Sequence, residues 1–248
     1  MIEMFETVAA ADGATPGGFY GIPGLYWLII GGSMLASWLV QMQMTSRFRE
    51  FSRIAVPLTG REVAERMLRE NGINDVRVVS VPGRLTDHYD PRKKTVNLSE
   101  AVFRANSVAA AAVAAHECGH AVQHAKAYAW LQMRTALVPV VQLSSGLMPW
   151  LLMGGLIMLA ATNSPALLAI GVLAFGATTL FSFVTLPVEF DASKRALAWI
   201  GRSGLAGSMD QDRARSALFW AAMTYVVAAL ASLAQLLYWA MILLGRRD

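Results

Sequence analysis

Four long apolar segments without a charged side chain constrain the fold of this chain more than any other feature. They span residues 22–40, 136–161, 166–186 and 217–244. A helix rises about 1.5 Å per residue, so each segment can cross a hydrocarbon layer about 30 Å thick. Buried helices of a soluble protein seldom supply four such segments in one chain. The sequence therefore predicts a mainly α integral membrane protein with about four transmembrane helices.

The overall composition supports a membrane protein. Charged residues make up 15% of the chain, whereas soluble globular proteins carry about 25%. The single cysteine excludes an intrachain disulfide framework. The formal net charge of +4 is modest, and we expect a lipid bilayer rather than nucleic acid as a partner of this chain.

The positions of the basic residues predict the orientation in the membrane. Residues 41–135 contain fourteen Lys and Arg, and residues 187–216 contain five, which together make nineteen of the twenty-one in the chain. Lys and Arg accumulate in cytoplasmic segments, so we expect both segments in the cytoplasm and the tail 1–21 outside. The two arginines after Gly245 are the exception. Because residues 1–21 contain no Lys or Arg, they do not resemble a secretory signal.

The polar stretch after the first apolar segment is expected to mix helix and strand. An amphipathic helix is predicted over 60–73, capped by Thr59 or Gly60. Strands are predicted at 76–81 and 94–98, where β-branched residues are frequent. These two strands are expected to form a small hairpin-like sheet.

A long alanine-rich helix is expected to follow, from about residue 99 to Gln132. This stretch has no proline, and its only glycine is Gly119. It carries His116, Glu117 and His120. Because residues four apart share one face of a helix, the two histidines can hold one metal ion, and the glutamate between them can reach water beside that ion.

The spacing His-Glu-x-x-His is typical of the active helix of zinc hydrolases. Zinc lowers the pKa of its bound water to about 7, and a nearby carboxylate can take the proton of that water. A lone histidine is more often an ordinary helix residue, but this composition gives only about 0.002 chance matches to the pattern. The sequence therefore predicts a catalytic zinc site with His116 and His120 as ligands and Glu117 as the general base.

Catalytic zinc usually has three protein ligands, so a third is needed. His124 is a poor choice, because it lies about 12 Å beyond His116 along a straight helix. We expect it behind the ligands or as a polar helix residue. Glu189 is the better candidate, in the first turn of a helix that Pro187 is predicted to open. The alternative for Glu189 is an acid that stabilises this helix dipole.

Three further residues have weaker predicted roles. Asp191 could orient the ring of a ligand histidine. Cys118 is expected to be an inert, small packing residue on the far side of the active helix. His88 is a weak candidate for stabilising an oxyanion and is more simply an ordinary surface side chain.

His-Glu-x-x-His on a helix is the zinc motif of metalloproteases, and a peptidase must hold its substrate extended beside the metal. An exposed strand edge can do this with main-chain hydrogen bonds. Because the predicted strand 94–98 leads into the active helix, its residues Thr95, Val96 and Asn97 are the expected substrate edge. The alternative is an ordinary strand with both edges occupied.

The sequence resembles the YugP-like zinc-dependent membrane peptidases of bacteria. The resemblance rests on "VAAHECGHAVQHAKAYAWLQMRTALVPVVQ", "LPVEFDASKRAL" and "ALFWAAMTYVVAAL" and covers about residues 25–244. It implies a cytoplasmic, gluzincin-like α+β metallopeptidase domain with a small β-sheet, distantly similar to HtpX-type and CAAX prenyl proteases. It also implies that His116, His120 and Glu189 hold one zinc ion. The resemblance further implies that the protein lies in the bacterial cytoplasmic membrane. Ser193 departs from the wider gluzincin pattern, which often has Asp at this position.

The leading hypothesis is an integral-membrane zinc endopeptidase that cleaves a peptide or membrane-protein substrate. A non-catalytic membrane scaffold with a structural zinc site is the alternative, although such a site closes with four ligands and needs no base. A transporter is less favoured, because the apolar segments carry no ionisable residue. The sequence identifies no oligomer or regulatory membrane partner, although either is compatible with it.

Overall fold

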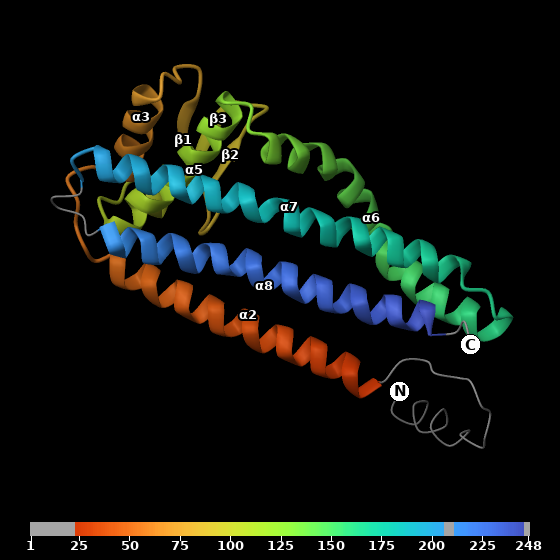
Figure 1. Ribbon diagram of the computed structural model, residues 1–248. Helices are drawn as coiled ribbons and strands as arrows, with labels where there is room; N and C mark the ends of the chain where they lie inside the picture. Colours follow the sequence, from red (N-terminus) through yellow and green to blue (C-terminus); the bar gives the residue numbers. More distant parts are fainter. Residues whose placement is uncertain (1–22, 206–210, 246–248) are drawn as a thin grey trace.

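The computed structural model describes residues 23–205 and 211–245 (Figure 1). Four of its helices are long and apolar enough to cross a membrane. They are α2 (Pro23–Phe51), α6 (Ala129–Thr162), α7 (Ala166–Arg202) and α8 (Gln211–Leu244). These helices contain the four predicted apolar segments apart from Ile22, which, like the predicted tail 1–21, lies outside the described residues.

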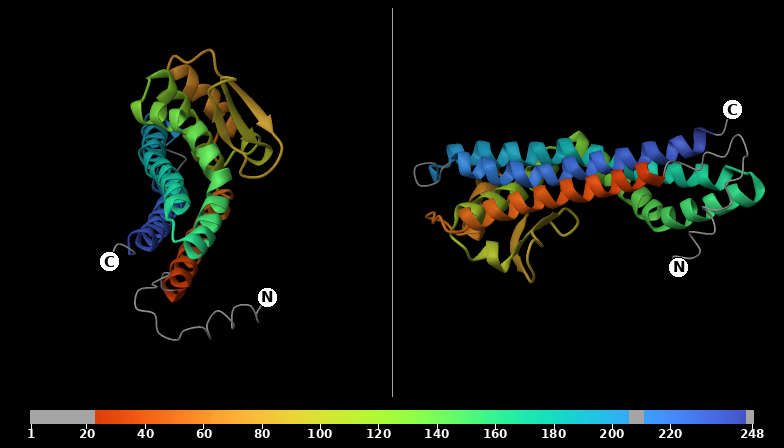
Figure 2. Two further views of the ribbon diagram at one scale, coloured as in Figure 1. Left: turned by 90° about the vertical axis from the view of Figure 1, so that its right-hand side faces the viewer. Right: turned by 90° about the horizontal axis from the view of Figure 1, so that it is seen from below.

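The four long helices lie side by side in a row, in the order α6, α7, α8 and α2 (Figures 1 and 2). Many large apolar side chains on this row face outward, among them Leu28, Trp150 and Leu173. A large exposed apolar surface of this kind is typical of a protein that contacts lipid or other proteins. The smaller elements gather at one end of the row, beside the start of α8 (Figure 1).

The helix α7 continues well past its apolar segment. Pro187 was predicted to open a new helix, and this is wrong, because Pro187 lies inside the continuous α7. Two prolines, Pro139 and Pro149, likewise lie inside α6. Neighbouring helices and local adjustment allow proline within long membrane helices. One helix therefore carries both the third apolar segment and Glu189.

The helix α3 (Gly60–Glu70) confirms the predicted amphipathic helix. Thr59 caps it through a capping box: its hydroxyl accepts a hydrogen bond from the Glu62 amide at 3.3 Å, and the Glu62 carboxylate accepts one from the Thr59 amide at 2.8 Å. The predicted apolar face is buried, including Val63 and Met67. It packs against α5 (Val108–Ala125), the helix that carries two of the three predicted metal ligands.

Within the described residues, the sheet has three strands in the order β1-β3-β2. The bounds are Arg77–Val81 for β1, His88–Asp90 for β2 and Thr95–Ser99 for β3. The two predicted strands are therefore present, but they pair parallel and do not form a hairpin. The short β2, which was not predicted, forms the hairpin with β3. Its turn is held by Asp90, whose carboxylate accepts hydrogen bonds from the amides of Arg92 and Lys93.

The predicted substrate edge is wrong. Thr95, Val96 and Asn97 lie on β3, the central strand, with β1 on one side and β2 on the other. All three residues are buried. The prediction failed because β2 occupies the edge that two strands alone would have left open. The free edges of this sheet belong to β1 and β2.

The single helix predicted from residue 99 to Gln132 is also wrong, because it is divided into α4 (Glu100–Phe103), α5 and the start of α6. At the first break, the Ser107 hydroxyl accepts from the Ala110 amide at 3.3 Å, and the Val108 amide donates to the Ile54 carbonyl at 3.0 Å. At the second break, between α5 and α6, Ala127 has a φ of 49°, which is a left-handed backbone conformation and not a helical one. Tertiary pairing and side-chain capping outweigh the helix propensity of alanine here.

Candidate metal centre

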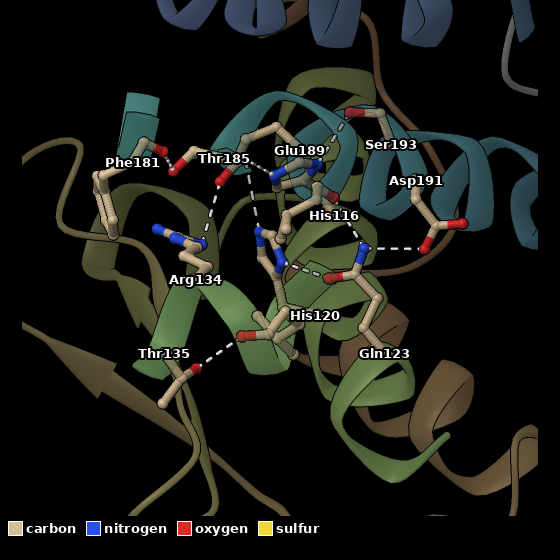
Figure 3. A network of polar contacts seen from close by, with 12 residues as sticks. His116, His120, Gln123, Arg134, Thr135, Phe181, Thr185, Glu189, Asp191 and Ser193 are labelled. Atoms are coloured by element: carbon tan, nitrogen blue, oxygen red, sulfur yellow. Dashed lines mark hydrogen bonds and ion pairs between the residues drawn. The ribbon is translucent and has the colours of Figure 1, made fainter. Parts of the chain in front are cut away.

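The helix α5, which carries His116 and His120, lies in the core. It packs against α7 just beyond the end of the apolar segment 166–186. Its first two turns are buried alanines and valine, which allow close packing against α3 and α7. Gly119 contacts the backbone of Ala192 in α7: a Cβ at Gly119 would lie 2.6 Å from the Ala192 carbonyl oxygen. The close approach brings the side chains of the two helices together (Figure 3).

Three potential metal ligands meet at this crossing. His116, His120 and Glu189 offer ligand atoms that all lie within 4.8 Å of one another. The Oε2 of Glu189 lies 3.2 Å from the Nε2 of His116 and 3.6 Å from the Nε2 of His120. The Glu189 side chain is only 3% exposed. The structure therefore brings together the three residues that were predicted as ligands.

The second ring nitrogen of each histidine is held by a polar side chain. The Nδ1 of His116 lies 3.1 Å from the Ser193 hydroxyl, and the Nδ1 of His120 lies 3.0 Å from the Gln123 amide oxygen (Figure 3). Such contacts fix the tautomer and direction of a ligand ring. Ser193 therefore contacts one of the candidate ligand histidines directly.

Gln123 also connects His120 to Asp191. Its side-chain amide donates to the Val188 carbonyl at 2.7 Å and to the Asp191 carboxylate at 2.8 Å. Asp191 in turn accepts from Arg195 at 2.6 Å. Asp191 thus contacts His120 only through Gln123, not directly. Gln123 was not predicted, although its position three residues after a ligand histidine was a usable signal.

Arg134, from the start of α6, completes the surroundings of Glu189. Its guanidinium lies 3.4 Å from the Oε1 of Glu189, the oxygen that does not face the histidines. One oxygen of the carboxylate therefore faces the ring nitrogens of the histidines, and the other faces the guanidinium cation (Figure 3). No sequence pattern signalled Arg134, because its approach to Glu189 depends on the break between α5 and α6.

Comparison with known proteins decides the family. The model of a family described as "putative neutral zinc metallopeptidase" matches residues 26–244. The chain belongs to this zinc metallopeptidase family. A relative named "Putative membrane protease YugP", from Bacillus subtilis (strain 168), is 41% identical over 224 residues, which cover 90% of this chain and 97% of that protein. No solved structure matches the chain.

For a zinc metallopeptidase, the environment of Glu117 is important. This residue is 8% exposed, and its side chain forms no hydrogen bond or ion pair with another residue in the described part of the chain. Burial lowers the pKa of the neighbouring His120, but the hydrogen bond with Glu189 and the charge of Glu117 outweigh burial, so the pKa is raised. Glu117 is thus a carboxylate beside the ligands without a structural partner.

The other weakly predicted residues lie outside the ligand group. The Nδ1 of His124 lies 2.8 Å from the hydroxyl of Tyr89 in β2, away from the ligand nitrogens. His88 is exposed, with its Nδ1 2.7 Å from the Thr86 carbonyl oxygen. Cys118 is fully buried, and burial raises the pKa of its thiol well above the usual value, which makes it unreactive.

Proposed function

We propose that this member of the zinc metallopeptidase family is an integral-membrane endopeptidase that hydrolyses peptide bonds in peptide or membrane-protein substrates. One observation carries the proposal. Two imidazole Nε2 atoms and the Oε2 of Glu189 face a common point beside Glu117, which has no hydrogen-bonding partner in the described part of the chain. A non-catalytic zinc site would not require such a carboxylate.

The donor set fits one zinc ion. Zinc in catalytic sites is bound by three protein side chains of the imidazole and carboxylate type, and one position stays open. His116 and His120 have their Nδ1 atoms engaged by Ser193 and Gln123, so only their Nε2 atoms are available as ligands. Glu189 would supply the third ligand atom through Oε2.

In the proposed hydrolysis, Glu117 would transfer the proton from the attacking water to the leaving group. Zinc, when bound, supplies a Lewis acid that acidifies water and polarises a carbonyl group. Glu117 would accept the proton of the attacking water and return it to the leaving amine of the cleaved peptide. Arg134 would hold Glu189 from the opposite side. The buried Ser193 and Gln123 would keep both imidazole rings directed at the same point.

We further propose that the four apolar segments, 22–40, 136–161, 166–186 and 217–244, span the cytoplasmic membrane of a bacterium. Residues 41–135 would then form the cytoplasmic catalytic segment, and 187–216 the cytoplasmic segment with the third ligand. The support is the excess of basic residues in these two segments. The active site would lie at the cytoplasmic face.

The proposal is tested with the purified protein in detergent. We expect about one zinc per chain by metal analysis, cleavage of a mixed peptide library, loss of cleavage with a chelator and recovery when zinc is returned. A protein that keeps one zinc per chain but cleaves no member of the library would support the structural-zinc scaffold instead.

A further inference from the structure

A groove lies between α7 and α8, beside the candidate metal centre. It has a volume of about 400 Å³. Apolar side chains form one part of its wall, including Phe190 from α7 with Leu218 and Phe219 from α8. Two cations, Lys194 of α7 and Arg215 of α8, line the same groove.

The charge of this groove is unbalanced. No Asp or Glu is among its lining residues in the described part of the chain. Lys194 and Arg215 are both exposed, and neither forms an ion pair or side-chain hydrogen bond with a residue in the ranges 23–205 and 211–245. Two neighbouring cations that lack acidic partners repel each other, and an anion between them would be stabilised.

The position of the groove along the helices indicates the kind of anion. The apolar segments end at residue 186 in α7 and begin at residue 217 in α8. Lys194 lies eight residues past the end of its segment, which is about 12 Å along a helix. The headgroup layer of a bilayer extends roughly 5–8 Å beyond the hydrocarbon, and a long lysine side chain can reach down into it.

The order of the side chains also matches a lipid. Phe190 lies nearer the apolar segment of α7 than Lys194 does, and Phe219 lies within the apolar segment of α8. Lys194 and Arg215 each lie about one turn farther toward the polar end of their helix. A phospholipid has its acyl chains and its phosphate in the same order. Basic pockets between transmembrane helices at the cytoplasmic side bind anionic headgroups in this way.

We propose that this groove binds one anionic phospholipid, with its phosphate between Lys194 and Arg215 and its upper acyl carbons against Phe190 and Phe219. The inference rests on the proposed membrane insertion but not on peptide hydrolysis. Ser193 also lines the groove, and its hydroxyl lies 3.1 Å from the Nδ1 of His116. The bound lipid would therefore lie one side chain away from a candidate zinc ligand.

Native mass spectrometry of the full-length protein in detergent tests the proposal. Phosphatidylglycerol is titrated into the delipidated protein, with phosphatidylcholine and inorganic phosphate in parallel arms. The double variant Lys194→Gln, Arg215→Gln removes both cations. The matched control is Arg49→Gln, Arg53→Gln, which removes two exposed cations from the same end of the neighbouring α2 region.

We expect the wild-type protein to bind one phosphatidylglycerol tightly. The double variant should bind it roughly 30-fold more weakly, and the control variant should bind it as tightly as wild type. This factor corresponds to the loss of two cations that each contribute about 1 kcal/mol near an anionic lipid. Phosphatidylcholine should not compete. Equal binding by the double variant and wild type would overturn the proposal, and so would displacement of the lipid by inorganic phosphate at low concentration, which would identify a free-phosphate site.

A second variant excludes general unfolding as the cause of lost binding. Ala198 is an exposed residue in the groove wall, and Ala198→Phe would fill the groove without a change in charge. We expect it to reduce lipid binding while zinc content and thermal stability stay normal. Normal lipid binding by Ala198→Phe would contradict the groove as the site. Zinc content and peptide cleavage are measured separately, so failure of the peptidase proposal would be distinguishable.

Discussion

Gly119 in α5 and Ala192 in α7 are in direct backbone contact. A Cβ at Gly119 would lie 2.6 Å from the carbonyl oxygen and 3.0 Å from the Cα of Ala192. The distance to the carbonyl oxygen is shorter than real Cβ contacts allow, so any side chain at residue 119 must push the helices apart. The contact lies between His116 and His120 on one helix and beside Glu189 on the other. Glycine at this position therefore permits the two halves of the ligand set to meet.

We predict that Gly119→Ala loses most of the bound zinc. The added methyl group faces rigid backbone, and overpacking of this kind costs about 1–3 kcal/mol and shifts the backbone. Gly176→Ala is the control. Gly176 lies in α7, the helix of Ala192, and a Cβ added there would have no atom within 4 Å. Metal analysis of both purified variants checks the prediction. Wild-type zinc content in Gly119→Ala would mean that the helix contact does not control the ligand geometry.

A second prediction separates the base from the ligands. Glu117→Gln should keep zinc, because both imidazoles and Glu189 remain, and should lower peptide hydrolysis by about 10²–10⁴-fold, because an amide cannot accept the proton of water. The control is Glu100→Gln, an exposed glutamate on α4. Zinc content and initial cleavage rates are measured together. Wild-type hydrolysis by a zinc-loaded Glu117→Gln would eliminate Glu117 as the base.

The sequence was sufficient for the parts of the site that depend on helix periodicity. One helix carries His116, Glu117 and His120, so their spacing alone predicted that their side chains lie close together. Glu189 was predicted because zinc needs a third ligand and no other glutamate follows the active helix. Gln123 and Arg134 were missed, because their roles depend on the angle of α5 to α7 and on the chain break before α6.

The sheet shows a second limit of sequence reasoning. The strand residues of β1 and β3 were predicted from their composition, but strand composition does not determine which strands are neighbours. β2 has only three residues, so it carried too short a pattern to be recognised. Its pairing with β3 nevertheless decides which edges of the sheet remain free.

A third prediction compares the two candidates for the third ligand. Glu189→Ala should lose most of its zinc, because it removes the carboxylate that faces both histidines. His124→Ala should keep zinc, because the His124 ring pairs with Tyr89 and is outside the ligand group. Metal analysis of the two variants in parallel checks this. The reverse result would reassign the third ligand to His124.

A fourth prediction concerns the pH dependence of stability at α3. Hydrogen bonds from the backbone amide and hydroxyl of Thr59 hold the pKa of Glu62 below its usual value. The ionised carboxylate therefore stabilises the folded state above the unfolded-state pKa of about 4.3. This contribution is lost as the pH falls through the lower folded-state pKa.

Glu62→Gln should consequently melt at a lower temperature than wild type at neutral pH, and the difference should shrink as the pH is lowered below about 4. Thermal unfolding in detergent across this pH range measures it. A difference between the two proteins that stays constant down to acidic pH would show that the charge of Glu62 does not contribute.

The last prediction concerns Arg134, whose guanidinium lies 3.4 Å from the Oε1 of Glu189 while Oε2 faces the histidines. We expect the contact with Arg134 to occupy Oε1, so that Glu189 would bind a metal through Oε2 alone. Arg134→Ala frees Oε1, so zinc affinity should fall by about 10–100-fold, the usual effect of removing a partner of a metal ligand. The visible absorption of the cobalt-substituted protein should also change, because its intensity depends on the coordination number.

Arg134→Lys keeps the charge but loses the planar fork, so it should recover only part of the affinity. The control is Arg47→Ala, which removes an Arg–Glu pair on α2 that has a similar N–O distance of 3.2 Å. Zinc affinity is measured by competition with a chromophoric chelator, and the cobalt spectrum is recorded on the same samples. If folded Arg134→Ala matches wild type in both measurements, Arg134 does not position Glu189, and its contact is an ordinary ion pair.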